Sequence, residues 1–136
     1  MKSITAIAIL FVPACGINFD YSDDPCAENG VAYTDEEAIN IAVRYLLTLN
    51  PKATDIPAED TKGWTISYDS IEDFHTRNPD CCFVERPVDK GGYVVAITYF
   101  RLHAQRPETG AGPIVQEDAK VGKFVRVDSC GNAYKI

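Results

Sequence analysis

The strongest hydrophobic pattern in the chain follows Thr34. The stretch Thr34-Asp35-Glu36-Glu37 has the composition of a capping box, in which a threonine and a glutamate three residues later satisfy each other's backbone amides. Apolar residues then recur at steps of three and four, which places them on one face of a helix. They are Ala38, Ile41, Ala42, Tyr45, Leu46 and Leu49. Since Asn50-Pro51 ends the pattern, the sequence predicts one amphipathic helix of about three turns.

Runs of alternating or β-branched residues after this helix predict strands. The strongest run is 93–102, which follows Gly91-Gly92 and is rich in valine, isoleucine and aromatic residues. Shorter candidates lie at 64–68, 82–86, 123–128 and 133–136. A Gly131-Asn132 turn joins the last two. A helix followed by strands predicts an α+β fold, with one main N-terminal helix packed on an antiparallel sheet of about three to five strands.

Two polar segments between these elements are expected to be loops. Residues 69–78 carry several acidic side chains, with Ile71 and Phe74 as isolated apolar anchors. Residues 105–122 contain two prolines and several glycines, and loops of that length often carry a function. Within this second segment, Arg106, Ile114 and Val115 are the residues expected to contact a protein partner.

The first fifteen residues have the order of an export signal. Lys2 precedes an apolar run from Ile4 to Val12, and Pro13 ends that run. The run is about half the length that a permanent transmembrane helix needs. Export is therefore expected, without a membrane-spanning anchor.

The end of this leader, Val12-Pro13-Ala14-Cys15-Gly16, resembles the lipobox of bacterial lipoproteins. The resemblance implies a diacylglyceryl thioether on Cys15, with palmitate-type acyl chains that hold the protein on the membrane. It divides the chain into a signal peptide (1–14), the lipid-anchor cysteine with a flexible acidic tether (15–30) and a single α+β domain (31–136). The periplasmic face of the outer membrane is the expected location. Ordinary signal cleavage, giving a periplasmic or secreted protein, and a buried N-terminal strand are the alternatives.

The acidic balance of the chain restricts its partners. Lysine and arginine number 13 against 20 aspartate and glutamate residues, giving a formal net charge of −7. Nucleic acid and anionic lipid would repel such a surface, so no nucleic-acid partner is expected. A cationic protein partner in the cell envelope is favoured over an anionic one, and the alternative is that the acidity mainly serves solubility.

Besides Cys15, four cysteines remain, an even number that suits an oxidising compartment. A bond between the neighbours Cys81 and Cys82 would close a strained eight-membered ring, so it is not expected. On a strand, one of the two sulfurs would face the core and the other would point outward or across an edge. The candidate disulfides therefore join Cys26 to one of these two residues and Cys130 to the other, in either order. A thiol-based metal site or a redox centre is less favoured, because the chain has no Cys-x-x-Cys and no paired histidines.

Catalytic signals are weak. His75 lies among Asp69, Glu72 and Asp73, but their spacing matches no ligand set, and His103 follows the strongest predicted strand. A thiol nucleophile from Cys81 or Cys82 with a histidine would tend to be oxidised in an exported protein. The chain is therefore expected not to be an enzyme, with no catalytic residues, no metal and no cofactor.

The opening of the predicted helix, Thr34-Asp-Glu-Glu-Ala-Ile-Asn-Ile-Ala42, and the final segment 124–136 resemble those of PepSY-like and cystatin-like exported domains. They are also similar to bacterial immunity proteins of nuclear-transport-factor-like shape. The resemblance implies a binding or inhibitory role, immunity against a cationic toxin being one case. A structural or assembly lipoprotein of the envelope is the alternative, and a small exported enzyme is a third hypothesis.

Overall fold

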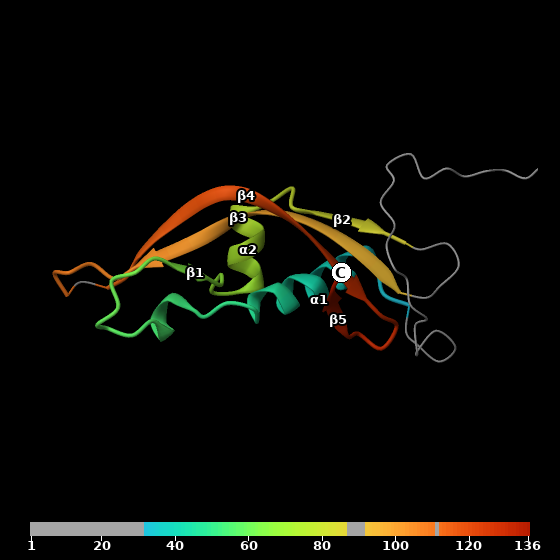
Figure 1. Ribbon diagram of the computed structural model, residues 1–136. Helices are drawn as coiled ribbons and strands as arrows, with labels where there is room; N and C mark the ends of the chain where they lie inside the picture. The colour runs from blue at the N-terminus through green and yellow to red at the C-terminus, as the bar shows by residue number, and fades with distance from the viewer. Residues whose placement is uncertain (1–31, 87–91, 111) are drawn as a thin grey trace, which may run out of the picture.

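The computed structural model describes residues 32–86, 92–110 and 112–136, in which two helices pack against one curved antiparallel sheet (Figure 1). The helices are α1 (Asp35–Leu47) and α2 (Ile71–Arg77), with a short 3-10 turn, η1 (Ala53–Asp55), between them. The strands are β1 (Trp64–Ile66), β2 (Cys82–Glu85), β3 (Tyr93–Gln105), β4 (Ile114–Val127) and β5 (Ala133–Lys135). The expected α+β class is confirmed. The main helix, α1, precedes every described strand but begins only at Asp35.

Strand β3 is the centre of the sheet. It pairs with β4 from Tyr93 to Gln105, and β5 adds to the far end of β4. On its other edge, β3 pairs with β2 over its first half and with β1 over its second half, so these two short strands lie end to end. The β3–β4 register shifts between Phe100 and Leu102, and irregularities of this kind bend a sheet. The sheet accordingly arches over α1 and α2 (Figure 1).

Side chains fill the interval between β1 and β2. The buried Asn78 accepts a hydrogen bond at its Oδ1 from the Phe100 amide, at 2.9 Å. Its Nδ2 donates to the Tyr68 hydroxyl at 3.1 Å, and that hydroxyl donates to the Phe100 carbonyl. Burial raises the pKa of Tyr68, so this hydroxyl keeps its proton. Two side chains therefore form hydrogen bonds with the backbone of β3 on the edge away from β4, at a point where no described strand pairs with it.

The N-terminus of α1 has the predicted capping box. The Glu37 amide donates to Thr34 Oγ1 at 3.2 Å, and the Thr34 amide donates to a Glu37 carboxylate oxygen at 2.8 Å. The buried face of α1 includes Val43, which the predicted stripe lacked. At the other end, Leu49 is 51% exposed, because the helix ends at Leu47 and Leu49 lies beyond its last turn.

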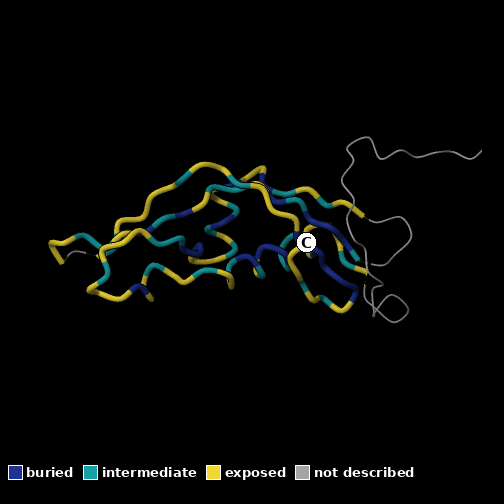
Figure 2. Tube along the Cα trace, in the orientation of Figure 1, coloured by how far each residue is buried: buried dark blue, intermediate teal, exposed yellow. Residues whose placement is uncertain are grey.

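The core lies between the helices and the concave side of the sheet. Side chains of α1 and α2 meet those of β3 and β4 there, with Phe74, Val43, Ile97 and Val125 almost completely buried. Figure 2 shows the contrast with β4, which is exposed or half-buried until its last three residues. The fold therefore buries one side of the sheet and leaves a long part of β4 open to solvent.

The polar loop expected at 69–78 is wrong, because this segment contains α2. Ser70 caps the helix by accepting from the Asp73 amide at 3.0 Å, and Phe74 is 1% exposed. A single buried aromatic residue per two turns leaves no periodic stripe in the sequence. The helix is stabilised by its cap and by packing, since short helices have little stability of their own.

The long loop expected at 105–122 is also wrong. Strand β3 continues to Gln105 and β4 begins at Ile114, so the two form a long hairpin (Figure 1). The first half of β4 faces solvent on both sides and therefore has no alternating hydrophobic pattern. Backbone pairing with β3 holds it as a strand.

Candidate functional site

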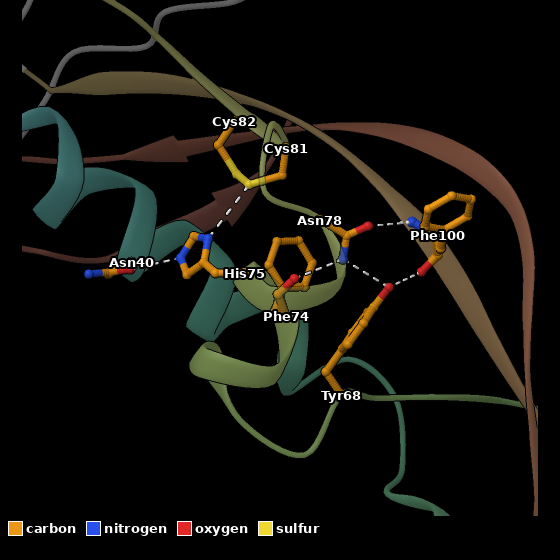
Figure 3. Close-up of a disulfide and its surroundings, with 8 residues drawn as sticks. All are labelled: Asn40, Tyr68, Phe74, His75, Asn78, Cys81, Cys82 and Phe100. Atoms are coloured by element: carbon orange, nitrogen blue, oxygen red, sulfur yellow. Dashed lines mark hydrogen bonds between the residues drawn. A yellow bond between two sulfur atoms is a disulfide. The ribbon is translucent and has the colours of Figure 1, made fainter.

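The two adjacent cysteines, Cys81 and Cys82, are bonded to each other (Figure 3). The expectation that they would pair with Cys26 and Cys130 is therefore wrong. The expectation also placed both cysteines on a strand, but Cys81 lies in the turn before β2, where its amide donates to the Asn78 carbonyl at 3.2 Å. The alternation of side chains along a strand does not separate the two sulfurs there.

Cys130 is also disulfide-bonded, with a partner other than Cys81 or Cys82. It lies in the turn between β4 and β5, as the sequence predicted for 129–132. The remaining cysteines, Cys15 and Cys26, are outside the described residues, as are the segments expected to be a signal peptide (1–14) and a tether (15–30).

His75 connects the Cys81–Cys82 disulfide to α1. Its Nδ1 lies 3.8 Å from Cys81 Sγ, and its Nε2 lies 3.1 Å from Asn40 Oδ1 (Figure 3). Because an amide oxygen only accepts, Nε2 carries the proton that it donates to Asn40. In the neutral imidazole, the lone pair of Nδ1 then faces the sulfur. The His75 and Phe74 rings also meet edge to face, with 5.7 Å between centroids.

The acidic neighbours of His75 in the sequence do not join it in a cluster. Asp73 instead pairs with Arg77 at 3.0 Å, and Arg77 also pairs with Glu117 of β4 at 2.8 Å. Across the described residues, no group of three or more histidine, cysteine, aspartate and glutamate side chains is placed to hold a metal ion.

A groove runs between α1 and α2 beside His75, with a volume of about 910 Å³. Its walls combine apolar, acidic and small polar side chains. They are Glu36, Ile39, Asn40, Ser70, Ile71, Glu72, His75 and Thr76. The groove therefore gives solvent and solutes a route to the histidine that touches the disulfide.

The three residues predicted to contact a partner lie near the end of the β3–β4 hairpin, but in different environments. Ile114 is 54% exposed and Val115 is 41% exposed. Arg106 instead donates from its guanidinium to the Ile56 carbonyl at 2.6 Å. It joins the end of β3 to the segment after η1, a structural role that the sequence did not indicate.

The outer edge of β4 has no described pairing partner over residues 114–123, a segment that we call the β4 edge. The inner side of β4 pairs with β3, whereas β5 pairs only with residues 125–127. No strand that the structure describes covers the β4 edge. Alternate residues of such an edge present unpaired amide and carbonyl groups, which can pair with another chain.

A second histidine, His103, lies on the outer face of the sheet. Its Nδ1 contacts a carboxylate oxygen of Asp118, and its Nε2 lies 3.4 Å from Thr65 Oγ1. Arg101 also approaches Asp118, at 3.6 Å. Thr65 and His103 are direct cross-strand partners in the β1–β3 ladder, so strand pairing accounts for their proximity. These contacts join β1, β3 and β4.

Asp128 organises the turn between β4 and β5. One of its carboxylate oxygens accepts from the Cys130 and Asn132 amides, both at 2.9 Å. The other accepts from the Asn132 side chain at 3.1 Å and from the Tyr134 hydroxyl. Burial alone would raise the pKa of Asp128, but these hydrogen bonds outweigh it and the pKa is lowered. The carboxylate has a structural role in the turn that carries Cys130.

Comparisons with protein-family models, with curated proteins and with solved structures gave no match to this chain. Among the described residues, no helix is long and apolar enough to cross a membrane.

Proposed function

We propose that this protein is an exported, lipid-anchored binding or inhibitor module of the bacterial cell envelope. Its β4 edge takes up an extended segment of a protein partner. The observation that carries the proposal is the open β4 edge, which begins at the exposed apolar residues Ile114 and Val115.

The β4 edge can accept an additional strand from a partner because its backbone and its side chains both offer contacts. An extended peptide beside β4 would form main-chain hydrogen bonds with the unpaired groups, and its alternate side chains would contact the two faces of the hairpin. Ile114 and Val115 would supply apolar contact at one end. The net charge of −7 favours a partner segment with basic side chains, since opposite charge speeds association.

The leader sequence supports the membrane attachment in this proposal. A lipid on Cys15 followed by the acidic segment 16–30 would hold the folded domain near the membrane surface. Fractionation of cells that express wild type or Cys15→Ser tests it. The wild type should partition into detergent with an added lipid mass, and the variant should be soluble. A variant that stays in the membrane fraction would contradict the anchor.

Partner binding is tested with the double variant Ile114→Asp, Val115→Asp. The wild type, immobilised, should retain a defined partner from an envelope extract of the source cells. The double variant should bind that partner about tenfold more weakly, because it removes two apolar contacts of about 1 kcal/mol each and about 1.4 kcal/mol is a factor of ten. Leu49→Asp is the control, since Leu49 is about equally exposed but lies just beyond the end of α1.

Hydrogen exchange separates strand addition from side-chain contact alone. With the partner bound, alternate amides between residues 114 and 123 should become protected, since only these point away from β3. Equal binding by the double variant, or protection that leaves the β4 edge unchanged, would refute this part of the proposal.

A further inference from the structure

We propose that the Cys81–Cys82 disulfide is a reversible thiol–disulfide exchange site. Its substrate class is a dithiol on a polypeptide segment that lies in the groove between α1 and α2. Cys82 is the sulfur that is attacked, Cys81 is the sulfur that leaves, and His75 holds the proton that Cys81 takes up.

The two sulfurs differ in accessibility and in partners. Cys81 is 7% exposed and lies 3.8 Å from His75 Nδ1. Cys82 is half-buried and starts β2, so it is the more accessible of the two. An incoming thiolate therefore reaches Cys82 more easily, and the sulfur it displaces is the one beside an imidazole.

The contacts of His75 suit a group that protonates a leaving thiolate. Asn40 Oδ1 accepts from Nε2–H and so fixes the ring orientation. A protonated ring keeps this hydrogen bond and directs Nδ1–H toward Cys81 Sγ, where its charge stabilises a thiolate. A leaving thiolate that is stabilised in this way departs faster in disulfide exchange.

The exchange balances in two steps. The first thiol of the substrate loses its proton to His75 Nδ1, and its thiolate bonds to Cys82 Sγ. The Cys81–Cys82 bond breaks, and Cys81 leaves with the electron pair and takes that proton from His75. The second thiol of the substrate then loses its proton to His75 and attacks the substrate sulfur of the mixed disulfide, which releases Cys82 as a thiolate. The substrate dithiol has become a disulfide, and Cys81 and Cys82 have been reduced.

The groove meets the disulfide through His75, since neither cysteine is among its lining residues, and a segment seated in it would set the substrate class. Its volume of about 910 Å³ admits a polypeptide segment, and Ile39 and Ile71 provide apolar contact. Glu36 and Glu72 in the same walls favour a cysteine flanked by basic residues and disfavour an anionic thiol.

The backbone around the disulfide is fixed independently of the sulfur bond. The Thr98 amide donates to the Cys81 carbonyl at 2.8 Å, and Cys82 pairs with Ile97 in the β2–β3 ladder. Opening of the disulfide therefore requires movement of the two side chains, while these strand contacts remain. The fold is expected to persist in both redox states.

The experiment uses the full oxidised protein and measures exchange by quenched alkylation and peptide mass mapping. The probes are two single-cysteine peptides, one with flanking arginines and one with flanking aspartates, and dithiothreitol. We expect the mixed disulfide on Cys82, faster reaction with the arginine peptide, and complete reduction of the Cys81–Cys82 bond by dithiothreitol with circular dichroism unchanged.

The variant His75→Gln tests the proton-holding role. It should slow the opening of the disulfide about tenfold or more, since a positioned histidine commonly contributes at least that much. His103→Gln replaces the other histidine and should leave the rate unchanged. An adduct on Cys81, free thiols at both positions in the oxidised protein, or equal rates for the two variants would overturn the proposal. The position of the adduct is determined with the wild-type protein, so this part of the test remains valid even if a variant folds poorly.

Discussion

Asn78 gives the sharpest test of how this sheet is completed. Its side chain forms three hydrogen bonds in the interval between β1 and β2, with the Phe100 amide, the Tyr68 hydroxyl and the Phe74 carbonyl. The substitution Asn78→Ala removes all three and leaves the backbone of α2 in place.

The loss in free energy of unfolding caused by Asn78→Ala depends on which hydrogen bonds each partner of Asn78 retains. The Phe74 carbonyl still accepts from the backbone amide of residue 78, and the Tyr68 hydroxyl still donates to the Phe100 carbonyl. Only the Phe100 amide loses its acceptor, which costs about 1–3 kcal/mol, and the other two bonds contribute about 0.5–1 kcal/mol each. The free energy of unfolding should therefore fall by about 3 kcal/mol.

Urea unfolding followed by circular dichroism measures this loss, and hydrogen exchange reports on the Phe100 amide directly. The control is Asn50→Ala, since Asn50 is half-buried and has no side-chain hydrogen bond among the described residues. The control should lose less than about 1 kcal/mol. If Asn78→Ala is no less stable than the control, or if the Phe100 amide exchanges as slowly as in wild type, the role assigned to Asn78 is refuted.

Three further predictions concern the turn between β4 and β5 and the N-terminus of α1. Hydrogen bonds lower the pKa of Asp128 in the folded state, so the carboxylate stabilises the fold at neutral pH, and this contribution is lost as the pH falls below about 4. In urea titrations, Asp128→Asn should therefore be less stable than wild type at pH 7, and its free energy of unfolding should fall less on acidification. Gly131→Ala should lower the melting temperature, since Gly131 has a φ of +82° and an added Cβ would lie 2.8 Å from the Tyr33 hydroxyl; an unchanged melting temperature would contradict this. Thr34→Ala removes the acceptor for the Glu37 amide and should cost about 1 kcal/mol by the same measurement, whereas Thr34→Ser should restore most of it.

The redox proposal and the binding proposal concern different parts of the molecule. The disulfide lies next to His75, which lines the groove between α1 and α2. The β4 edge is the edge of β4 that faces away from β3. Their tests are therefore independent, and failure of one leaves the other standing.

Local signals in the sequence were sufficient for α1 and for the strands that contribute to the core. A capping box is completed within four residues, and the periodicity of α1 comes from its own buried face. β3 has a high content of β-branched and aromatic residues because it is the central strand. The hairpin turn before Ala133 likewise depends on adjacent residues.

Tertiary structure alone decided α2, the first half of β4 and the Cys81–Cys82 bond. Each depends on partners distant in the sequence: Phe74 is buried in the shared core, the exposed residues of β4 pair with β3, and Cys81 is placed by the turn after α2. The same holds for the contact of His75 with Asn40, which are 35 residues apart. The sequence determined the elements whose stabilising contacts are local, whereas packing and strand pairing determined the two candidate sites.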